Sequence, residues 1–298
     1  MVSARPCSEE HTPVLPDDIA DTVATALAED VGDGDRSAAA ALEDQQTRAR
    51  LTVKEAGVLA GCAWFDEVFR QLDDKLRIDW QMTDGAELKA QACVCVLTGS
   101  ARTILTGERT ALNFLQLLSG VATSTRRLVD RVKGTRAVVL DTRKTLPGLR
   151  AAQKYAVCCG GGVNHRSGLY DGILIKENHI AVAGSVTAAV ERVRAAHPDM
   201  PVQVEVENLH ELDEALINEV NSVLLDNFPT HILSRAVKMC PKPTRYSKFE
   251  ALSEASGNID LKSIRGVADT GVDRISVGGL TKHVTAIDFS LRIDPQQS

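Results

Sequence analysis

The sequence predicts an α/β fold whose second half alternates parallel strands with helices. Short apolar runs recur in that half, and each is followed by a segment with helical periodicity. The chain has 298 residues, of which 44% are hydrophobic and 25% charged, so it can bury a sizeable core. Alternation of this kind implies parallel strands joined by right-handed crossovers. An incomplete α/β barrel and an open doubly wound sheet fit the periodicity equally well.

The first third of the chain mixes helices with strands. Residues 16–29 fit a helix with its apolar side chains on one stripe. The acidic segment 30–35 invites a calcium-loop reading, but Ala38 occupies the position where such a loop needs glycine, so we expect a structural turn. Strands are expected at 51–53, 76–80 and 92–97. A long helix over 108–132 is expected to be interrupted at Ser119 and Gly120.

The second half contains about six predicted strands, fewer than the eight of a full barrel. They lie at 137–140, 173–175, 202–206, 223–225, 250–253 and 275–277. The helical segments between them lie at 149–159, 186–196, 209–220, 231–240 and 261–268. Asn208, with Glu211 three residues later, fits a capping box at the start of one of these helices.

Charged residues and glycines follow all six of these strands. In chain order they are Asp141 to Lys144, Lys176, Glu205 and Glu207, Asp226, Glu254 to Ser256, and Gly278 with Gly279. Both candidate folds bind ligands beyond the carboxyl ends of their parallel strands. Strand ends that simply meet water would account for one or two such cases. We therefore interpret the whole set as one ligand site.

Five basic groups belong to this set or to the loop after 160–162: Arg143, Lys144, His165, Arg166 and Lys176. Each one alone would be read as a solvated surface cation. Together, they fit a polyanion, because arginine forks grip carboxylates and lysines act as point charges on phosphate.

Carboxylates and glycine turns complete the predicted site. Glu205 and Asp226 can bind ribose hydroxyls, hold Mg²⁺ or stabilise a cationic sugar, although an ion pair with Lys176 is the structural alternative. Glu207 shares the face of Glu205, so the pattern leaves open which of them points inward. The turns at Ser256–Gly257 and at Gly278–Gly279 suit a phosphate, and as the last two strand ends they match the usual phosphate position of barrels.

Composition excludes several other classes of protein. A net charge of −6 argues against a nucleic-acid or membrane surface but leaves anionic small substrates open. The 7 cysteines lack metal or disulfide spacing, so we expect reduced thiols. No Walker lysine motif or G-x-G-x-x-G fingerprint occurs. Without a secretory signal or a run of membrane-spanning length, the expected location is the cytoplasm.

The motifs taken together resemble the quinolinate phosphoribosyltransferases. Beyond 28–32, the matching segments are 107–113, 119–123, 141–145, 161–166, 174–179, 205–207, 225–227, 254–258 and 276–279. The resemblance implies an N-terminal α/β open sandwich plus an incomplete, six- to seven-stranded α/β barrel. The implied domains are 1–120, joined by the C-terminal segment 281–298, and 121–280. It also implies a homodimer in which Arg109 enters the partner's barrel.

The same resemblance implies the reaction and its residues. Phosphoribosyl pyrophosphate and quinolinate would give nicotinate mononucleotide, pyrophosphate and CO2, with Mg²⁺ as cofactor. Residues implied at the quinolinate pocket are Arg143, His165, Arg166 and Lys176, with Arg109 of the partner subunit. Residues implied to handle phosphoribosyl pyrophosphate and the metal are Lys144, Glu205 and Asp226, and those implied to hold the sugar phosphate are Ser256, Gly257, Gly278 and Gly279. The implied catalytic groups are Lys144, Lys176, Glu205 and Asp226.

Three rival functions stay open on the residues alone. A related phosphoribosyltransferase would use nicotinate or another aromatic acceptor. An aldolase would use Lys176 as a Schiff-base nucleophile. A binding or scaffold protein would have the same fold but would show no catalytic turnover.

Overall fold

The structure is a computed structural model that describes residues 13–243 and 249–295. Within these residues the chain forms two compact units. One unit contains residues 127–144 and 162–279. The other contains residues 13–126, 145–161 and 280–295.

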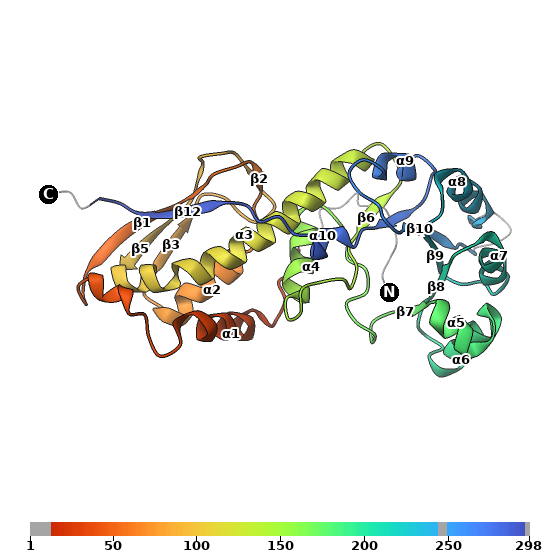
Figure 1. Ribbon diagram of the computed structural model, residues 1–298, viewed down its shortest axis with the longest axis horizontal. Helices are drawn as coiled ribbons and strands as arrows, with labels where there is room; N and C mark the ends of the chain where they lie inside the picture. Colours follow the sequence, from red (N-terminus) through yellow and green to blue (C-terminus); the bar gives the residue numbers. More distant parts are fainter. Residues whose placement is uncertain (1–12, 244–248, 296–298) are drawn as a thin grey trace. The chain divides into compact units, whose positions relative to one another are not determined.

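The unit that holds the N-terminal part is an open sandwich of one sheet and helices. Its sheet has the order β12-β1-β5-β3, and all neighbouring strands are antiparallel. The bounds are β1 Gln46–Val53, β3 Arg77–Trp80, β5 Cys93–Ser100 and β12 Phe289–Ile293, with the short pair β2 Gly57–Val58 and β4 Glu87–Leu88. Helices α1 Ile19–Val31, α2 Cys62–Leu72 and α3 Ala101–Val132 lie on one face of this sheet (Figure 1). Trp64, Phe65 and Phe69 of α2 are buried in between.

Strand β12 brings the C-terminal segment back to the first sheet. It pairs with β1, with Leu291 opposite Leu51. Both side chains are buried, so the return adds apolar contacts as well as backbone hydrogen bonds. The pattern of residues alone did not predict this strand; it followed from the resemblance.

The predicted interruption of the long helix is wrong. Helix α3 runs continuously through Ser119 and Gly120. A Cβ atom on Gly120 would lie 2.3 Å from the carbonyl oxygen of Thr285, so glycine is needed for close approach, not for a break. The Ser119 hydroxyl donates to the carbonyl oxygen of Ala60 at 3.2 Å and accepts from the Ala60 N–H at 3.1 Å.

The acidic segment after α1 is a structural turn, as predicted. One carboxylate oxygen of Asp35 accepts hydrogen bonds from the N–H groups of Ser37 at 2.8 Å and Ala38 at 3.1 Å. The hydroxyl of Thr106 donates to the other oxygen at 3.1 Å. The carboxylate therefore holds its own turn against α3.

The second unit is built on a parallel sheet of six strands in the order β6-β11-β10-β9-β8-β7. The bounds are β6 Val138–Leu140, β7 Ile173–Ile175, β8 Val202–Val206, β9 Ser222–Asp226, β10 Leu252–Ser256 and β11 Arg274–Ser276. Strands β6 and β7 do not pair with each other within residues 13–243 and 249–295, so the sheet stays open. The incomplete barrel of the predicted fold class is confirmed.

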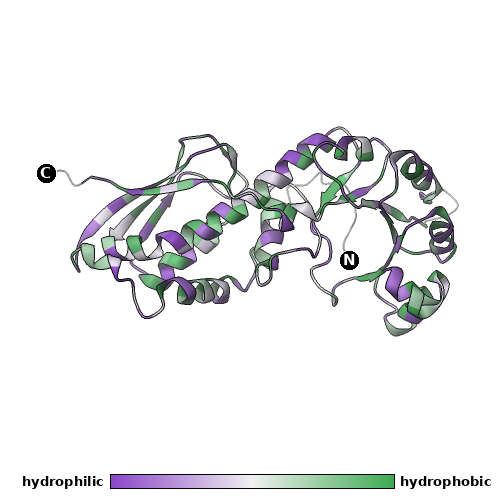
Figure 2. Cartoon of the chain, viewed as in Figure 1, coloured by the Kyte–Doolittle hydropathy of each residue, from purple (hydrophilic) through white to green (hydrophobic). Residues whose placement is uncertain are grey.

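Helices cover the outer side of this sheet (Figure 1). They are α5 Glu177–Ala183, α6 Val186–Ala196, α7 Leu209–Ile217, α8 Thr230–Met239 and α9 Ile264–Ala268; α4 Arg150–Cys159 and α10 Gly279–Lys282 complete the helices. Figure 2 shows hydrophilic and hydrophobic residues interleaved along the covering helices, as expected where one face is buried. Leu212 of α7 and Leu233 of α8 provide such buried side chains. One-sided coverage excludes the doubly wound alternative.

Two boundary differences affect the site. The strand predicted at 250–253 is β10, Leu252–Ser256, so Glu254 lies inside the strand instead of beyond it. Helix α5 was not predicted and begins directly after Lys176. The Asn208 half of the predicted capping box is confirmed, since its side chain accepts from the N–H groups of His210 at 3.1 Å and Glu211 at 3.0 Å. The Glu211 carboxylate accepts from the N–H of Glu207 at 2.8 Å.

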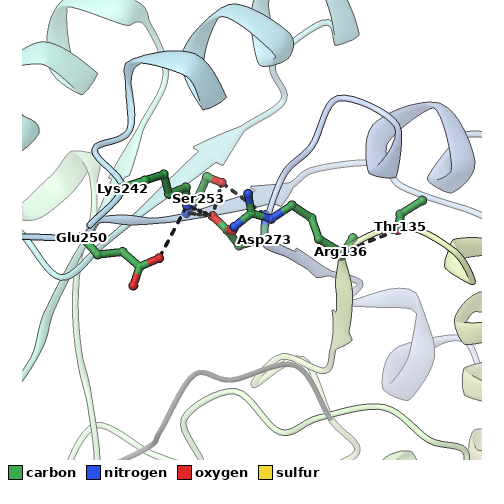
Figure 3. Close-up of polar contacts among 7 residues, drawn as sticks. Thr135, Arg136, Lys242, Glu250, Ser253 and Asp273 are labelled. Carbon is green, nitrogen blue, oxygen red and sulfur yellow. Dashed lines mark hydrogen bonds and ion pairs between the residues drawn. The ribbon is translucent and has the colours of Figure 1, made fainter. Parts of the chain in front are cut away.

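A polar cluster ties together the amino ends of β6, β10 and β11 (Figure 3). Asp273, only 8% exposed, accepts hydrogen bonds from Ser253 Oγ at 2.6 Å, Ser253 N at 2.9 Å and Lys242 Nζ at 2.9 Å. The guanidinium of Arg136 pairs with its other oxygen. Burial alone would raise the pKa of Asp273, but the hydrogen bonds from Ser253 and Lys242 outweigh it and hold that pKa below its ordinary value.

Two expectations from composition concern the described residues only. Six cysteines there are free thiols, as predicted, while Cys7 lies outside the described residues. Burial raises the pKa of Cys240 to about 11, which suits a small apolar side chain and not a nucleophile. No helix between residues 13 and 295, apart from the undescribed 244–248, is long and apolar enough to cross a membrane.

Candidate active site

The carboxyl ends of the six strands surround a cavity of about 240 Å³. The residues that line it are Thr142, Arg143, Lys144, His165, Arg166, Leu174, Lys176, Glu205, Leu224, Asp226, Glu254, Ser256 and Ser276. Eight predicted site residues are among them: Arg143, Lys144, His165, Arg166, Lys176, Glu205, Asp226 and Ser256. Parallel strands bring these residues together because each crossover returns the chain to the same edge of the sheet.

Two arginines form the cationic part of the cavity. The pKa of Arg166 is lowered, first by burial and next by the positive charge of Arg143. The Nε of Arg143 is buried and has no hydrogen-bond partner among the described residues. Two guanidinium groups held near each other, one with an unsatisfied N–H, form a site that an anion would stabilise.

Internal hydrogen bonds hold the loop that carries Arg166. Asp141, fully buried, accepts from the N–H of His165 at 2.9 Å. Asp171 accepts from the N–H groups of Ser167 at 2.7 Å and Gly168 at 2.9 Å. The Arg166 guanidinium donates to the carbonyl oxygen of Gly172 at 2.9 Å, which leaves further N–H groups for a ligand. Asp141 thus supports the site from beneath the loop.

Glu205 and Asp226 form the acidic part of the cavity. Burial raises the pKa of Glu205, the ion pair with Lys176 opposes that shift, and the charge of Asp226 adds to it. The ion pair that we considered as a structural alternative therefore exists, and both of its members line the cavity.

The question of which glutamate points inward is settled. Glu205 has a side chain only 12% exposed. Glu207 is exposed, does not line the cavity, and its N–H donates to Glu211 at 2.8 Å. Strand β8 ends at Val206, so Glu207 already belongs to the turn before α7 and strand alternation does not reach it.

The start of α5 positions Lys176. Its N–H donates to Nδ1 of His179 at 3.0 Å, and this local bond fixes the backbone where the strand becomes a helix. The motif 174–179 therefore contains a cavity lysine and the histidine that holds its backbone in place. Sequence reasoning had given His179 no role.

The glycine turns flank the cavity without lining it. Gly257 has φ +97°, and a Cβ there would lie 2.2 Å from Oδ1 of Asn227, so only glycine fits. Asn227 also accepts a hydrogen bond from Asn258 at 3.2 Å, which joins the loops after β9 and β10. A Cβ on Gly278 would lie 2.9 Å from Cδ of Lys144, and Gly279 opens α10.

Sequence reasoning missed Ser276, which lines the cavity, and it gave no individual role to Thr142 and Glu254, which belonged to the predicted set of strand ends and also line it. Thr142 accepts from the N–H of Lys144 at 3.1 Å. The hydroxyl oxygen of Ser276 is buried without a hydrogen-bond partner among the described residues. Glu254 had been placed beyond its strand. The signal that would have found Ser276 and Glu254 is a polar residue inside an apolar strand, which is rare unless it has a role.

Arg109 belongs to the other unit and is not among the cavity residues of this chain. It is exposed on α3, as is Asn113, and Gln116 donates to Asn113 at 3.4 Å. The polar stripe therefore faces solvent in the single chain.

Basic groups opposite paired carboxylates, at the carboxyl ends of an incomplete α/β barrel, define an enzyme site for anionic substrates. Residues 31–119 match the family "Quinolinate phosphoribosyl transferase, N-terminal domain", and residues 121–292 match "Quinolinate phosphoribosyl transferase, C-terminal domain". The chain therefore belongs to the quinolinate phosphoribosyltransferase family.

Individual relatives agree with this family. The chain is 45% identical over 247 residues to a nicotinate-nucleotide pyrophosphorylase (carboxylating) of Mycobacterium leprae, covering 81% of this chain and 84% of that protein. It is 39% identical over 266 residues to a probable enzyme of the same name from Bacillus subtilis, covering 89% and 90%. The solved nicotinate-nucleotide pyrophosphorylase from Francisella tularensis superposes with a TM-score of 0.89 at 45% identity, covering 95% of this chain and 98% of that one.

Proposed function

We propose that this enzyme transfers the phosphoribosyl group of phosphoribosyl pyrophosphate to quinolinate. The products would be nicotinate mononucleotide, pyrophosphate and CO2, a step in the de novo synthesis of NAD. The observation that carries the proposal is the cavity at the carboxyl ends of the strands, which Arg143, Arg166, Glu205 and Asp226 line. There the buried Nε of Arg143 has no hydrogen-bond partner among the described residues. The relatives named above support the choice of substrates.

The acceptor would bind in the cationic part. Quinolinate has two carboxylates, and two guanidinium groups can each bind one in a bidentate manner. We assign to this subsite the residues Arg143, His165, Arg166 and Lys176, with Arg109 of the partner subunit. Lys176 would add charge while staying paired with Glu205.

The phosphoribosyl donor would bind toward β9, β10 and β11. Lys144 and Asp226 line the cavity there, and Ser256 is the last residue of β10. The turns at Gly257, Gly278 and Gly279 flank it, and we assign them with Ser256 to the sugar phosphate. Close packing of Gly278 against Lys144 places a lysine beside the proposed phosphate turn.

The residues present fit Mg²⁺ that is held mainly by the substrate. Among the described residues, no three His, Cys, Asp or Glu side chains gather closely enough to hold a metal by themselves. Magnesium is commonly bound through one or two carboxylates plus substrate phosphates, and Glu205 and Asp226 offer that number. When bound, Mg²⁺ would neutralise charge on the departing pyrophosphate.

The residues of the chain would orient the reaction and stabilise its charges. The ring nitrogen of quinolinate already has a lone pair, so its attack on the anomeric carbon needs no general base. Glu205 and Asp226 would stabilise the cationic character that develops on the sugar. The pyridinium nitrogen then makes loss of the adjacent carboxylate as CO2 feasible, because the ring carbanion left behind lies next to a positive charge. That carbon would take up a proton from solvent, which gives nicotinate mononucleotide.

The test is turnover with defined substrates. Incubation with quinolinate, phosphoribosyl pyrophosphate and Mg²⁺ is expected to give nicotinate mononucleotide and one CO2 per turnover. Turnover of nicotinate in place of quinolinate, without CO2, would show that the acceptor is wrong. Lack of turnover with either acceptor would indicate a binding protein.

The aldolase reading is tested at Lys176. An ion pair with Glu205 favours the ammonium form over the nucleophilic amine that a Schiff base requires. Borohydride treatment with carbonyl substrates is expected to leave Lys176 unmodified, which mass spectrometry of its peptide would show. A reduced adduct on that peptide would support the aldolase.

The homodimer is part of the proposal. Exposed Arg109 has no place in the cavity of its own chain, and family resemblance gives it one in the partner's. Arg109→Ala and Lys144→Ala are each expected to be inactive alone. After exchange of subunits, half of the dimers would be mixed and have one intact site each, which returns about a quarter of wild-type activity. No recovery in verified mixed dimers would contradict a shared site.

The location of the enzyme stays a prediction. We propose the cytoplasm, where fractionation of the source cells is expected to find the activity. Activity that sediments with membranes would contradict this location.

A further inference from the structure

A chain of hydrogen-bonded polar groups runs from the buried Glu254 of β10 to the half-buried loop that carries Arg166. Glu254 is fully buried inside β10, and its Oε2 accepts a hydrogen bond from Gln203 Nε2 of β8 at 2.9 Å. Gln203 Oε1 lies 3.0 Å from Nε2 of His165. The N–H of Arg166 donates to Nδ1 of the same imidazole at 2.7 Å. Four residues on three segments are thereby connected.

The chemistry of one carboxylate fixes the direction of every bond in this chain. A carboxylate only accepts, so the amide NH2 of Gln203 faces Glu254 and its carbonyl oxygen faces His165. Nε2 of His165 must then carry the proton, which leaves Nδ1 free to accept from Arg166. Nε2 also lies 3.5 Å from Glu254 Oε1, which has no hydrogen-bond partner among the described residues. The arrangement selects the neutral Nε2–H tautomer of His165.

This chain of hydrogen bonds lies against the candidate active site. Glu254 lines the cavity at the carboxyl ends, Gln203 lines a second cavity at the amino ends, and His165 lines both. A fully buried carboxylate is costly unless charges or hydrogen bonds compensate it. Stability alone gives no reason for this cost, because apolar side chains would fill the interior of the sheet as well.

We propose that Glu254 is a positioning residue for acceptor binding, acting through Gln203 and His165 on Arg166. The hydrogen-bond chain holds the backbone N–H of Arg166 in position. It thereby fixes where the Arg166 guanidinium lies when it binds a substrate carboxylate. Both ring nitrogens of His165 are engaged within the protein, so His165 offers the substrate its ring surface and no N–H donor. This inference rests on the proposed function, because it takes the carboxylate that Arg166 binds to be one of the two carboxylates of quinolinate.

The first measurement is made on the wild-type protein and needs no substitution that threatens folding. Nitrogen-15 NMR of histidine-labelled enzyme is expected to show His165 protonated on Nε2 alone at neutral pH. The His165→Gln variant identifies the signal by its loss. A proton on Nδ1, or on both nitrogens, would overturn the proposal even if the enzyme proved to use another substrate.

The second measurement uses Glu254→Gln, which keeps the shape and removes the charge that directs the chain. We expect the affinity for quinolinate to fall about 10-fold, as for loss of a hydrogen bond to a charged group, while the affinity for phosphoribosyl pyrophosphate stays unchanged. The NMR signal of His165 is expected to show a mixture of tautomers. Unchanged quinolinate affinity would overturn the proposal. Asp273→Asn, the same change at the amino ends of the strands, is the matched control and should leave quinolinate affinity intact.

A double-mutant cycle separates positioning from a general structural role. With Arg166→Ala already present, Glu254→Gln is expected to cause no further loss in kcat/KM for quinolinate. An equal loss in both backgrounds would show that Glu254 acts by another route. If the wild type neither binds nor turns over quinolinate, the proposed function fails, and the tautomer measurement still decides whether the chain of bonds exists.

Discussion

The two ends of the six-stranded sheet use charge in opposite ways. At the amino ends, Asp273 is surrounded by donors from Ser253, Lys242 and Arg136, and its pKa is held low. At the carboxyl ends, Arg143 keeps a buried N–H without a partner among the described residues, and the pKa of Glu205 is raised. The amino ends satisfy the charge of Asp273 internally, whereas the carboxyl ends keep the buried Nε–H of Arg143 for a ligand.

The difference shows that the size of a cavity does not locate a site. The cavity at the amino ends is larger, about 690 Å³ against about 240 Å³. Among its residues are Asp273, whose charge is already neutralised, and the apolar beginnings of strands such as Val138 and Val202. The smaller cavity instead contains the buried Nε of Arg143, which has no hydrogen-bond partner among the described residues, and Glu205, whose pKa burial raises.

The largest expected effect lies at the cationic part of the site. Arg166→Ala should weaken quinolinate binding by about 2–5 kcal/mol, because it removes one partner of a buried charge pair. Titration calorimetry would measure the loss. Arg274→Ala, which changes an arginine at the amino ends, is the matched control and should bind quinolinate normally. Similar losses in both variants would remove the functional distinction between the two ends.

The acidic part should control activity at low pH. Glu205 is needed as a carboxylate, and because burial raises its pKa, acidification should protonate it at a pH above the ordinary glutamate value of 4.5. The kcat/KM for phosphoribosyl pyrophosphate is therefore expected to fall on the acid side from that higher pH. Glu205→Gln should reduce activity by about 100-fold and remove this limb of the profile. An unchanged profile in Glu205→Gln would assign the limb to another group.

At the amino ends the expected effect is on stability. Asp273→Asn should lower the free energy of unfolding at pH 7 by about 1.5–3 kcal/mol, since hydrogen bonds to a charged group are lost. The folded-state pKa lies below the ordinary 3.8, so this stability is present above 3.8 and is lost as pH falls through the folded-state value. Urea unfolding across pH measures it, and the folded variant should keep wild-type kcat. A loss of kcat in the folded variant would show that Asp273 contributes to catalysis.

The smallest effect is expected at a helix cap near the carboxyl ends. Asn208→Ala should lower stability by about 1 kcal/mol, because two N–H groups at the start of α7 lose their acceptor. Thermal unfolding would detect this change, and quinolinate affinity should not move. A change in quinolinate affinity would show that the loop between β8 and α7 contributes to substrate binding as well as to stability.

The sequence determined much of the second unit because each of its elements is locally encoded. Runs such as Val202–Val206 and Ile173–Ile175 were placed correctly, since a short apolar run bounded by polar residues fixes a strand. The charged residues that follow these strands could be recognised for the same reason, because they bound the apolar runs. Glu254 was misplaced because a polar residue in an apolar run reads as the end of a strand, and only packing shows that it is inside.

Other features were decided by contacts between distant segments. Gly120 reads as a helix break, yet Thr285 explains it, and no local pattern connects residues that far apart. Strand β12 finds its place only when β1 offers an edge. The sequence by itself thus determined the strands, the helices and the identity of the charges. The tertiary structure decided which charges are neutralised, because desolvation and pairing depend on neighbours that are remote along the chain.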